Sequence, residues 1–324
     1  MGNTVAGRTR GPIQTAMSQR RIHPFGIISA MLMSPAAVIL LIGAQPERSP
    51  NFERGVLPAR WTFENSDCAK APPFLVHEYN ATFIILRQSG CTHFEKPFLY
   101  LVYGANQALL FDTGASGADV SSTIDELLRW HSTRQKRPAL PVLVVHSHGH
   151  GDHTAGDEAL SRRPGARVID ATPEALVQFF KIKNWPGENV EYDLGGRIVD
   201  IVPIPGHEPA SIAIYDRLTG ILLTGDTLYP GRLYVADARA FNASIDRLVD
   251  FTATREVAHV LGAHIENRRT PYLDYPRGTA FQPEEHALEL GRAHLIELQD
   301  ALRQMGSQLQ RRSFRDFTVW PIVQ

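Results

Sequence analysis

The segment HSHGHGDHTAG, residues 146–156, constrains this chain more than any other stretch. The chain has 13 histidines, and four of them fall within the eight positions 146–153. Imidazole is the commonest protein ligand for transition metals, and a neighbouring carboxylate extends the set of donors. The segment therefore predicts a metal site.

The spacing inside the segment favours two ions over one. His148 and His150 lie two residues apart, so a turn can direct both at the same ion. Asp152 and His153 are adjacent and must point in different directions, which suits a second ion close by. The glycines between these ligands allow the backbone to fold tightly. His146 is expected to lie outside the site.

The surrounding sequence alternates between strand and helix patterns. Residues 140–145 form a short β-branched run that stops where the histidines begin, and residues 119–132 have helical spacing. Thr172 is the expected N-cap of a further helix, and residues 283–306 are expected to form one long amphipathic helix. This order favours either two sheets sandwiched between helices or an open α/β sheet, and the pattern alone leaves both open.

Four more polar residues stand at the ends of expected strands: Asp112, His207, Asp226 and His264. Each one, taken singly, is explained as well by a turn, a cap or a core position. Ligands at the carboxyl ends of buried strands sit on a rigid platform that opens into loops. Their shared placement therefore adds all four to the candidate site.

Charge and cysteine content limit the function classes. The formal net charge is −1, so no basic surplus indicates nucleic acid as a partner. The two cysteines, Cys68 and Cys91, lack the C-x-x-C spacing of a zinc or redox site. They are either two separate buried thiols or, in an exported protein, a disulfide.

The N-terminus has the order of an export signal. Residues 1–24 contain arginines but no lysine or acidic residue, and the next segment, residues 25–44, carries no charge. The run ends at the small residue Ala44, and a polar stretch follows. The apolar run is nearly long enough to span a bilayer, so an uncleaved anchor is the alternative. We expect a periplasmic or secreted protein, or one whose only membrane contact is its N-terminus.

The pattern H-x-H-x-D-H within HSHGHGDHTAG resembles the signature of the metallo-β-lactamase-fold superfamily. The segments FDTG, PGHEPAS, TGDTLY and LGAHIE fit the same family in order, and the resemblance covers roughly residues 80–270. It implies an α/β fold, an αββα sandwich with the metal ions between its sheets. The expected organisation is a signal or anchor over 1–45, a lead segment over 46–80, the hydrolase domain over 81–310 and a tail over 311–324.

Carried over by position, the resemblance implies two metal sites that share one bridging ligand. The first ion takes His148, His150 and His207; the second takes Asp152, His153 and His264; Asp226 bridges them. The resemblance implies that Asp112 orients these ligands without binding a metal ion itself.

The chemistry of such a set follows from general principles. A zinc pair about 3.5–4 Å apart holds a bridging hydroxide and makes it a nucleophile at neutral pH. Asp152, besides ligating, is expected to orient that hydroxide. The expected function is hydrolysis of a small thioester, lactone or related carboxylic acid derivative. Zinc suits the histidines, with iron or manganese as alternatives.

Residues at and near the bridging position narrow the set of expected reactions. Asp226 resembles the bridge of glyoxalase-II-like thioesterases and lactonases more than true metallo-β-lactamases. Tyr229 stands where acyl-homoserine lactonases place a tyrosine, and is either an oxyanion donor or a packing aromatic. Arg232 is expected to be solvated, with Tyr234 beside it. The alternatives are a β-lactam hydrolase, an iron-dependent persulfide dioxygenase and an inactive metal-binding module.

Overall fold

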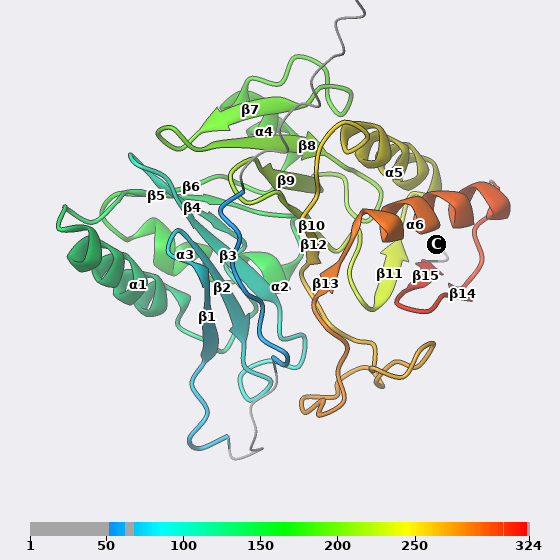
Figure 1. Ribbon diagram of the computed structural model, residues 1–324, viewed down its shortest axis with the longest axis horizontal. Coiled ribbons are helices and arrows are strands. Elements are labelled where there is room, and N and C mark those ends of the chain that lie inside the picture. The colour runs from blue at the N-terminus through cyan, green and yellow to red at the C-terminus, as the bar shows by residue number, and fades with distance from the viewer. Residues whose placement is uncertain (1–51, 62–67, 307, 323–324) are drawn as a thin grey trace, which may run out of the picture. The chain divides into compact units, whose positions relative to one another are not determined.

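The strand patterns form two six-stranded sheets that pack face to face (Figure 1). The structure is a computed structural model that describes residues 52–61, 68–306 and 308–322, all within the unit Arg48–Gln324. In the first sheet the spatial order follows the chain order: β1 (Phe74–Asn80), β2 (Phe83–Gln88), β3 (Phe98–Tyr103), β4 (Ala108–Phe111), β5 (Val142–Val145) and β6 (Ala166–Val168). The first four strands pair antiparallel, and β4, β5 and β6 pair parallel.

The second sheet has the spatial order β13-β12-β10-β9-β8-β7. Its strands are β7 (Val190–Asp193), β8 (Ile198–Pro203), β9 (Ile212–Asp216), β10 (Ile221–Gly225), β12 (His259–Gly262) and β13 (Glu289–Leu290). A small third sheet joins β11 (Arg232–Val235), β14 (Arg312–Ser313) and β15 (Thr318–Pro321).

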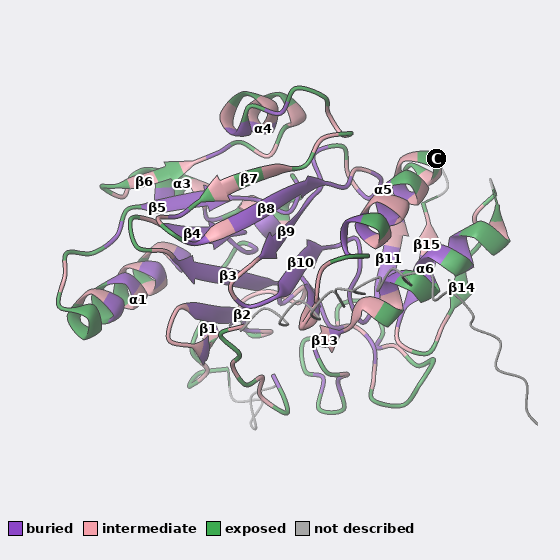
Figure 2. Cartoon of the chain, turned by 45° about the horizontal axis from the view of Figure 1, so that its top comes forward, coloured by how far each residue is buried: buried purple, intermediate pink, exposed green. Residues whose placement is uncertain are grey.

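Helices cover the outer faces of the two large sheets. The helix α1 (Val120–Gln135) packs on the first sheet, and α5 (Ala238–Phe251) and α6 (Arg292–Met305) pack on the second. Three shorter helices lie in the connections: α2 (Gly151–Thr154), α3 (Asp157–Ser161) and α4 (Pro173–Phe180). Figure 2 shows the central strands buried and the helices exposed on their outer sides.

The layering explains the sequence of the central strands. Strands β2 and β3 are buried along their whole length, because each has the inter-sheet core on one face and a helix layer on the other. Such strands read as continuous apolar runs instead of alternating ones. The αββα sandwich is therefore confirmed, and the open-sheet alternative is excluded.

The sequence prediction of the last helix was partly wrong. The helix begins at Arg292 and not at 283, although it ends before Gly306 as expected. Leu288 and Leu290 are both buried, which is the period-two pattern of a strand, and Glu289–Leu290 pairs with β12. The expected N-cap Thr172 is confirmed, because its side chain accepts a hydrogen bond from the Ala175 N–H.

The sheets extend beyond the expected domain bounds of 81–310. At one end β1 begins at Phe74, and at the other β15 pairs with β11. The two cysteines, Cys68 and Cys91, form a disulfide. The segment 25–44 lies outside the described residues. Of the helices that are described, none has the length and apolar character needed to cross a membrane.

Candidate metal centre

Strand ends bring all the predicted ligands to one edge of the sandwich. Asp112 follows β4, His148 and His150 follow β5, Asp152 and His153 lie in α2, His207 follows β8, Asp226 follows β10 and His264 follows β12. Parallel neighbours end at the same edge of a sheet, so β4 with β5, and β10 with β12, deliver their polar residues together. Residues up to 152 positions apart in sequence, from Asp112 to His264, thus share one site.

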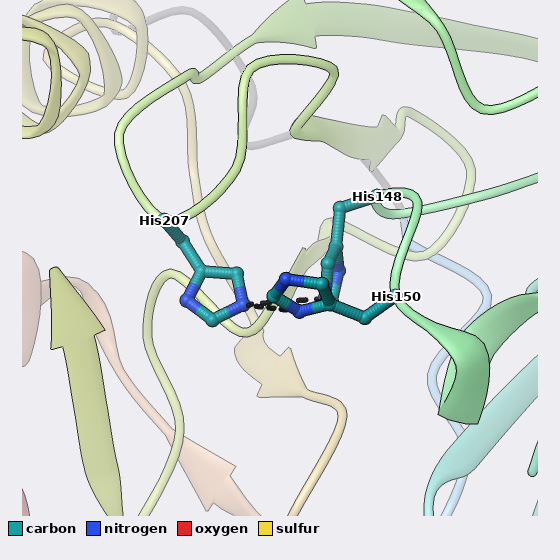
Figure 3. A group of neighbouring side chains, drawn as sticks. All are labelled: His148, His150 and His207. Atoms are coloured by element: carbon teal, nitrogen blue, oxygen red, sulfur yellow. Dashed lines mark hydrogen bonds between the residues drawn. The ribbon is translucent and has the colours of Figure 1, made fainter. Parts of the chain in front are cut away.

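The first group of donors contains three histidines (Figure 3). His148 Nε2 lies 2.9 Å from His150 Nδ1, and His207 Nε2 lies 3.2 and 3.1 Å from these two atoms. The backbone before His207 needs a glycine, because a Cβ at Gly206 would lie 2.4 Å from backbone atoms of Phe241. The group is therefore fixed by the close approach of the β8 loop to α5.

The second group of donors contains Asp152, His153 and His264. The Oδ2 atom of Asp152 lies 3.3 Å from the Nε2 atoms of both histidines. His153 and His264 are buried, and Asp152 is partly buried at the cavity wall. Their three ligand atoms lie within 4.8 Å of one another.

Asp226 connects the two groups through its two carboxylate oxygens. Its Oδ2 lies 3.6 Å from His207 Nε2 in the first group. Its Oδ1 lies 3.2 Å from His264 Nε2 and 3.6 Å from His153 Nε2 in the second. The carboxylate is thus placed to give one oxygen to each group.

Asp112 sets the orientation of His153. The Asp112 carboxylate accepts hydrogen bonds from the Ser147 backbone N–H (2.6 Å) and hydroxyl (2.9 Å), and lies 2.9 Å from His153 Nδ1. That contact places a proton on Nδ1 and leaves Nε2 facing the site. The Asp112 backbone has φ +70°, an uncommon conformation for a residue other than glycine.

The two groups differ in their affinity for protons. Burial lowers the pKa of His148 and of His207, which keeps both imidazoles neutral and able to bind metal. Burial also disfavours charge on His153, but the carboxylates of Asp112, Asp152 and Asp226 outweigh it and raise the pKa to about 10. The second group therefore attracts a cation strongly.

The same balance holds for the carboxylates of this region. Burial alone would raise the pKa of Asp152 and of Asp226. The neighbouring histidines, His153 and His264, outweigh it and hold both pKa values well below the usual range. Both side chains are therefore carboxylates at neutral pH, the form that binds metal.

These donors fit metal ions better than they fit one another. A neutral imidazole nitrogen either donates or accepts, so three nitrogens that face a common point cannot all be satisfied by hydrogen bonds. His207 Nδ1 lies 2.8 Å from the Tyr234 carbonyl oxygen, which leaves its Nε2 as a lone pair. Zinc–nitrogen distances of about 2.0–2.1 Å place two nitrogens of one tetrahedral ion about 3.3 Å apart. In addition, His153 Nε2 and Asp226 Oδ1 are buried without a hydrogen-bond partner.

Comparison with known proteins agrees with this geometry. A family model described as "Metallo-beta-lactamase superfamily" matches residues 97–264, which include Asp112 and every ligand of both groups. The match covers more than half of the chain.

The chain belongs to the metallo-beta-lactamase superfamily.

Two curated relatives of this chain are hydrolases by name, and one of them is a thioesterase. A hydroxyacylglutathione hydrolase from Anaeromyxobacter dehalogenans is 33% identical over 41% of this chain and 46% of its own length. The "Acyl-coenzyme A thioesterase MBLAC2" of Bos taurus is 24% identical over 51% of this chain and 72% of its own length. The chain thus spans about half the length of the hydroxyacylglutathione hydrolase. Among solved structures, a metallo-beta-lactamase from Pontibacter korlensis is 19% identical, covering 71% of this chain and 99% of its own, with a TM-score of 0.48.

The superfamily's donor set opens into a cavity of about 430 Å³. Tyr229 and Tyr234 line it beside the ligands. The Tyr229 hydroxyl donates to the Arg232 carbonyl and lies 3.2 Å from a Glu266 oxygen, so its proton is already engaged within the protein. Its role as an oxyanion donor stays a prediction.

The expectation that Arg232 is solvated was wrong. Its side chain is buried, and its guanidinium forms ion pairs with Glu266 (2.5 Å) and Asp274 (2.8 Å). His146 lies outside both donor groups as expected, with its Nε2 3.1 Å from an Asp157 oxygen.

Four residues of the cavity wall were missed by the sequence reasoning: Glu95, Glu266, Arg277 and Ile322. Glu95, Arg277 and Ile322 belong to no motif or periodic segment, whereas Glu266 is the last residue of LGAHIE. Glu266 alone carried a signal, because it stands two residues after His264. The other three reach the cavity through loops and the C-terminal strand, whose course depends on contacts between distant parts of the chain.

Proposed function

We propose that this protein is a hydrolase that uses two zinc ions to cleave a small thioester, lactone or related carboxylic acid derivative. The observation that carries the proposal is the division of the Asp226 oxygens between two groups of three donors. The names of the relatives, a hydroxyacylglutathione hydrolase and an acyl-coenzyme A thioesterase, support a thioester. The volume of the cavity supports a small-molecule substrate.

In this proposal the two donor groups, with Asp226 between them, would hold zinc ions, which would lower the pKa of a water and polarise the substrate carbonyl. The Asp152 carboxylate, at the cavity wall, orients that water. The water oxygen bonds to the carbonyl carbon, and the bond from that carbon to sulfur or oxygen breaks. The leaving group takes a proton from the water. The products are a carboxylic acid and a thiol or alcohol.

The first test is proton release in a pH-stat, with metal content measured on the same samples. Metal-loaded and chelator-treated protein would each be assayed with a panel of thioesters, lactones, β-lactams and simple esters. We expect two zinc ions per chain and metal-dependent turnover of a thioester or lactone. Turnover of β-lactams alone would reject the proposed reaction. So would the absence of turnover of every panel substrate when two metal ions are bound.

The variant His150→Ala tests the assignment of the first donor group. It removes one of three nitrogens, so hydrolysis should fall by at least about 100-fold while the fold stays intact, because His150 is exposed. His77→Ala, at a half-buried histidine of β1 outside the donor groups, is the control. A fully active His150→Ala enzyme would refute the assignment.

We also propose that residues 25–44 direct export or anchor the protein in a membrane. The uncharged run after a basic segment supports this, and so does the disulfide, since disulfides persist in oxidising compartments. Fractionation of cells and the mass of the native protein would distinguish a cleaved signal, an uncleaved anchor and a cytoplasmic protein, the last of which would contradict the proposal.

A further inference from the structure

The cavity wall contains a carboxylate that belongs to neither donor group and accepts no hydrogen bond from the described residues. Glu95 stands in the loop that connects β2 to β3, and its side chain lines the cavity. Its backbone carbonyl lies 3.0 Å from His264 Nδ1, which places the residue directly beside the second donor group. Its carboxylate, however, belongs to none of the groups whose ligand atoms converge within 4.8 Å.

The loop that carries Glu95 is fixed at several points. Cys91 is bonded to Cys68, and the Lys96 ammonium donates to the Thr279 carbonyl at 2.6 Å. At the end of the loop the Phe98 N–H donates to the Ala263 carbonyl, 2.8 Å away, next to His264. The backbone under Glu95 is therefore held in place on both sides, which suits a residue that positions a ligand.

Glu95 differs from the other glutamate of the wall, Glu266, in what it contacts. Glu266 accepts hydrogen bonds from the Arg232 backbone N–H (2.7 Å) and guanidinium (2.5 Å), so its charge is neutralised within the protein. The described residues donate no hydrogen bond to the Glu95 carboxylate. Among the described residues, its ion-pair contact is with Arg277, at 3.9 Å. A partly buried carboxylate without a close partner is unfavourable, and a cation from a ligand relieves this.

The exposed fractions of the Glu95 and Arg277 side chains decide which of the two recognises a charge on a ligand. The Arg277 side chain is 77% exposed, so water screens its charge and bulk ions compete for it. The Glu95 side chain is 26% exposed and faces the cavity. Of these two side chains, Glu95 therefore sets the stronger charge preference in its part of the cavity, and it favours a positive group.

We propose that Glu95 binds an ammonium group of the substrate, so that the enzyme prefers thioesters or lactones with a protonated amine near the cleaved carbonyl. This inference rests on the proposed hydrolytic function and names the substrate class of the same site. Glu95 is a specificity residue in this proposal and takes no part in bond cleavage. An anionic substrate of the same size would be repelled by the same carboxylate.

Two thioesters of one thiol test the preference, because the β-alanyl and butanoyl groups have the same shape and differ in ammonium against methyl. We expect the wild-type kcat/KM to be higher for the β-alanyl thioester. Glu95→Gln keeps the size of the side chain and should lower the ratio of the two kcat/KM values by about 10- to 100-fold. Glu284→Gln, an exposed glutamate that does not line the cavity, should leave this ratio unchanged.

A third thioester, malonyl, presents a carboxylate in place of the ammonium. A wild-type preference for malonyl that Arg277→Gln abolishes would overturn the proposal and assign recognition to the arginine. Equal kcat/KM values for the β-alanyl and butanoyl thioesters would also overturn it.

Binding of uncleavable analogues separates this proposal from the proposed reaction. In the corresponding ketones a methylene replaces the sulfur, and calorimetry on metal-loaded protein gives the ratio of their Kd values. If no thioester or lactone is hydrolysed, the proposed reaction fails, while a Kd ratio that favours the amino ketone and falls in Glu95→Gln still supports the role of Glu95. A ratio that is the same in wild type and Glu95→Gln rejects that role.

Discussion

Asp112 shows how one residue determines the chemistry of another that is distant in sequence. Its carboxylate contacts the backbone N–H and hydroxyl of Ser147 and the Nδ1 atom of His153, so it fixes the turn after β5 and the tautomer of a proposed metal ligand together. The left-handed backbone of Asp112 costs on the order of 1–3 kcal/mol, and such strain persists where the surroundings hold it. The expected supporting role of Asp112 thus has a geometric basis.

Asp112→Asn should weaken metal binding without removing a ligand. An asparagine side chain has one acceptor oxygen, so its NH2 group would face either a Ser147 donor or the His153 Nδ1 proton. We expect metal affinity at the second donor group to fall by about 10- to 100-fold. Chelator competition measures this, with Asp170→Asn, an exposed aspartate, as the control. An unchanged affinity would show that Asp112 serves the turn alone.

The raised pKa of His153 predicts how metal stabilisation depends on pH. In the metal-free protein this pKa is about 10, against an ordinary 6.5, so the bound proton contributes stability below pH 6.5 that is lost as the pH rises through 10. A metal ion bound at the proposed second site would replace that proton. The difference in free energy of unfolding between metal-loaded and metal-free protein should therefore grow from pH 6.5 to 10.

Denaturant unfolding of both forms across this pH range measures the difference. Lys96, whose burial lowers its pKa to about 8, titrates in both forms and cancels when they are subtracted. A difference that stays constant with pH would contradict the assignment of His153 as a metal ligand.

The seven proposed ligands could be predicted from sequence because each follows a short apolar strand, and a strand end is a local feature. Glu95 could not, because nothing in the residues around it indicates that its loop passes His264. Arg232 was misjudged for a related reason: its partners, Glu266 and Asp274, are more than 30 positions away. Pairing between distant charges has no local signature.

At the scale of elements, the strands were easier to predict than the connections. The β3 strand and the first four residues of β2 are continuous apolar runs because both of their faces are covered. The segment after β12, by contrast, has no period, and it is held by single contacts such as the buried ion pair between Arg87 and Glu285 at 2.6 Å. Such contacts tie a loop to a sheet nearly 200 positions away, and the sequence pattern does not show them.

The disulfide makes the β2–β3 connection a stabilising element of its own. It closes a loop of 23 positions, and the loss of chain entropy in the unfolded state corresponds to about 3 kcal/mol. The double variant Cys68→Ser, Cys91→Ser should lose that amount of unfolding free energy in urea. We also expect a higher KM, because Glu95 lies four residues after Cys91.

A reducing agent provides the matched comparison for this prediction. It should lower the stability of the wild type toward that of the double variant and leave the double variant unchanged. Equal unfolding free energies for wild type and double variant would show that the bond does not hold this loop.

At the scale of the whole molecule, three apolar cores hold the layers together. One lies between the two large sheets, one under α1, and one between the second sheet, α5, α6 and the third sheet. The third sheet contains strands from residues 311–324, which were expected to be a tail. The expectation failed because β14 and β15 are only two and four residues long and form a sheet through distant pairing: β15 pairs with β11, about 80 positions earlier, and β14 pairs with β15.

The C-terminal segment should therefore be necessary for both the fold and the site. Phe317 is fully buried in the core shared with α5 and α6. Phe317→Ala should cost about 3–5 kcal/mol of unfolding free energy. Arg312→Ala, an exposed position on β14, should cost less than about 0.5 kcal/mol and is the control.

The effect of Phe317→Ala should reach the proposed metal centre, because β15 pairs with β11, and the carbonyl of Tyr234 in β11 contacts His207 Nδ1. Metal titration of Phe317→Ala under folded conditions should thus show weaker binding at the first donor group. A protein truncated after residue 310 that kept wild-type stability and metal affinity would instead establish that these residues are the dispensable tail which their sequence pattern indicated.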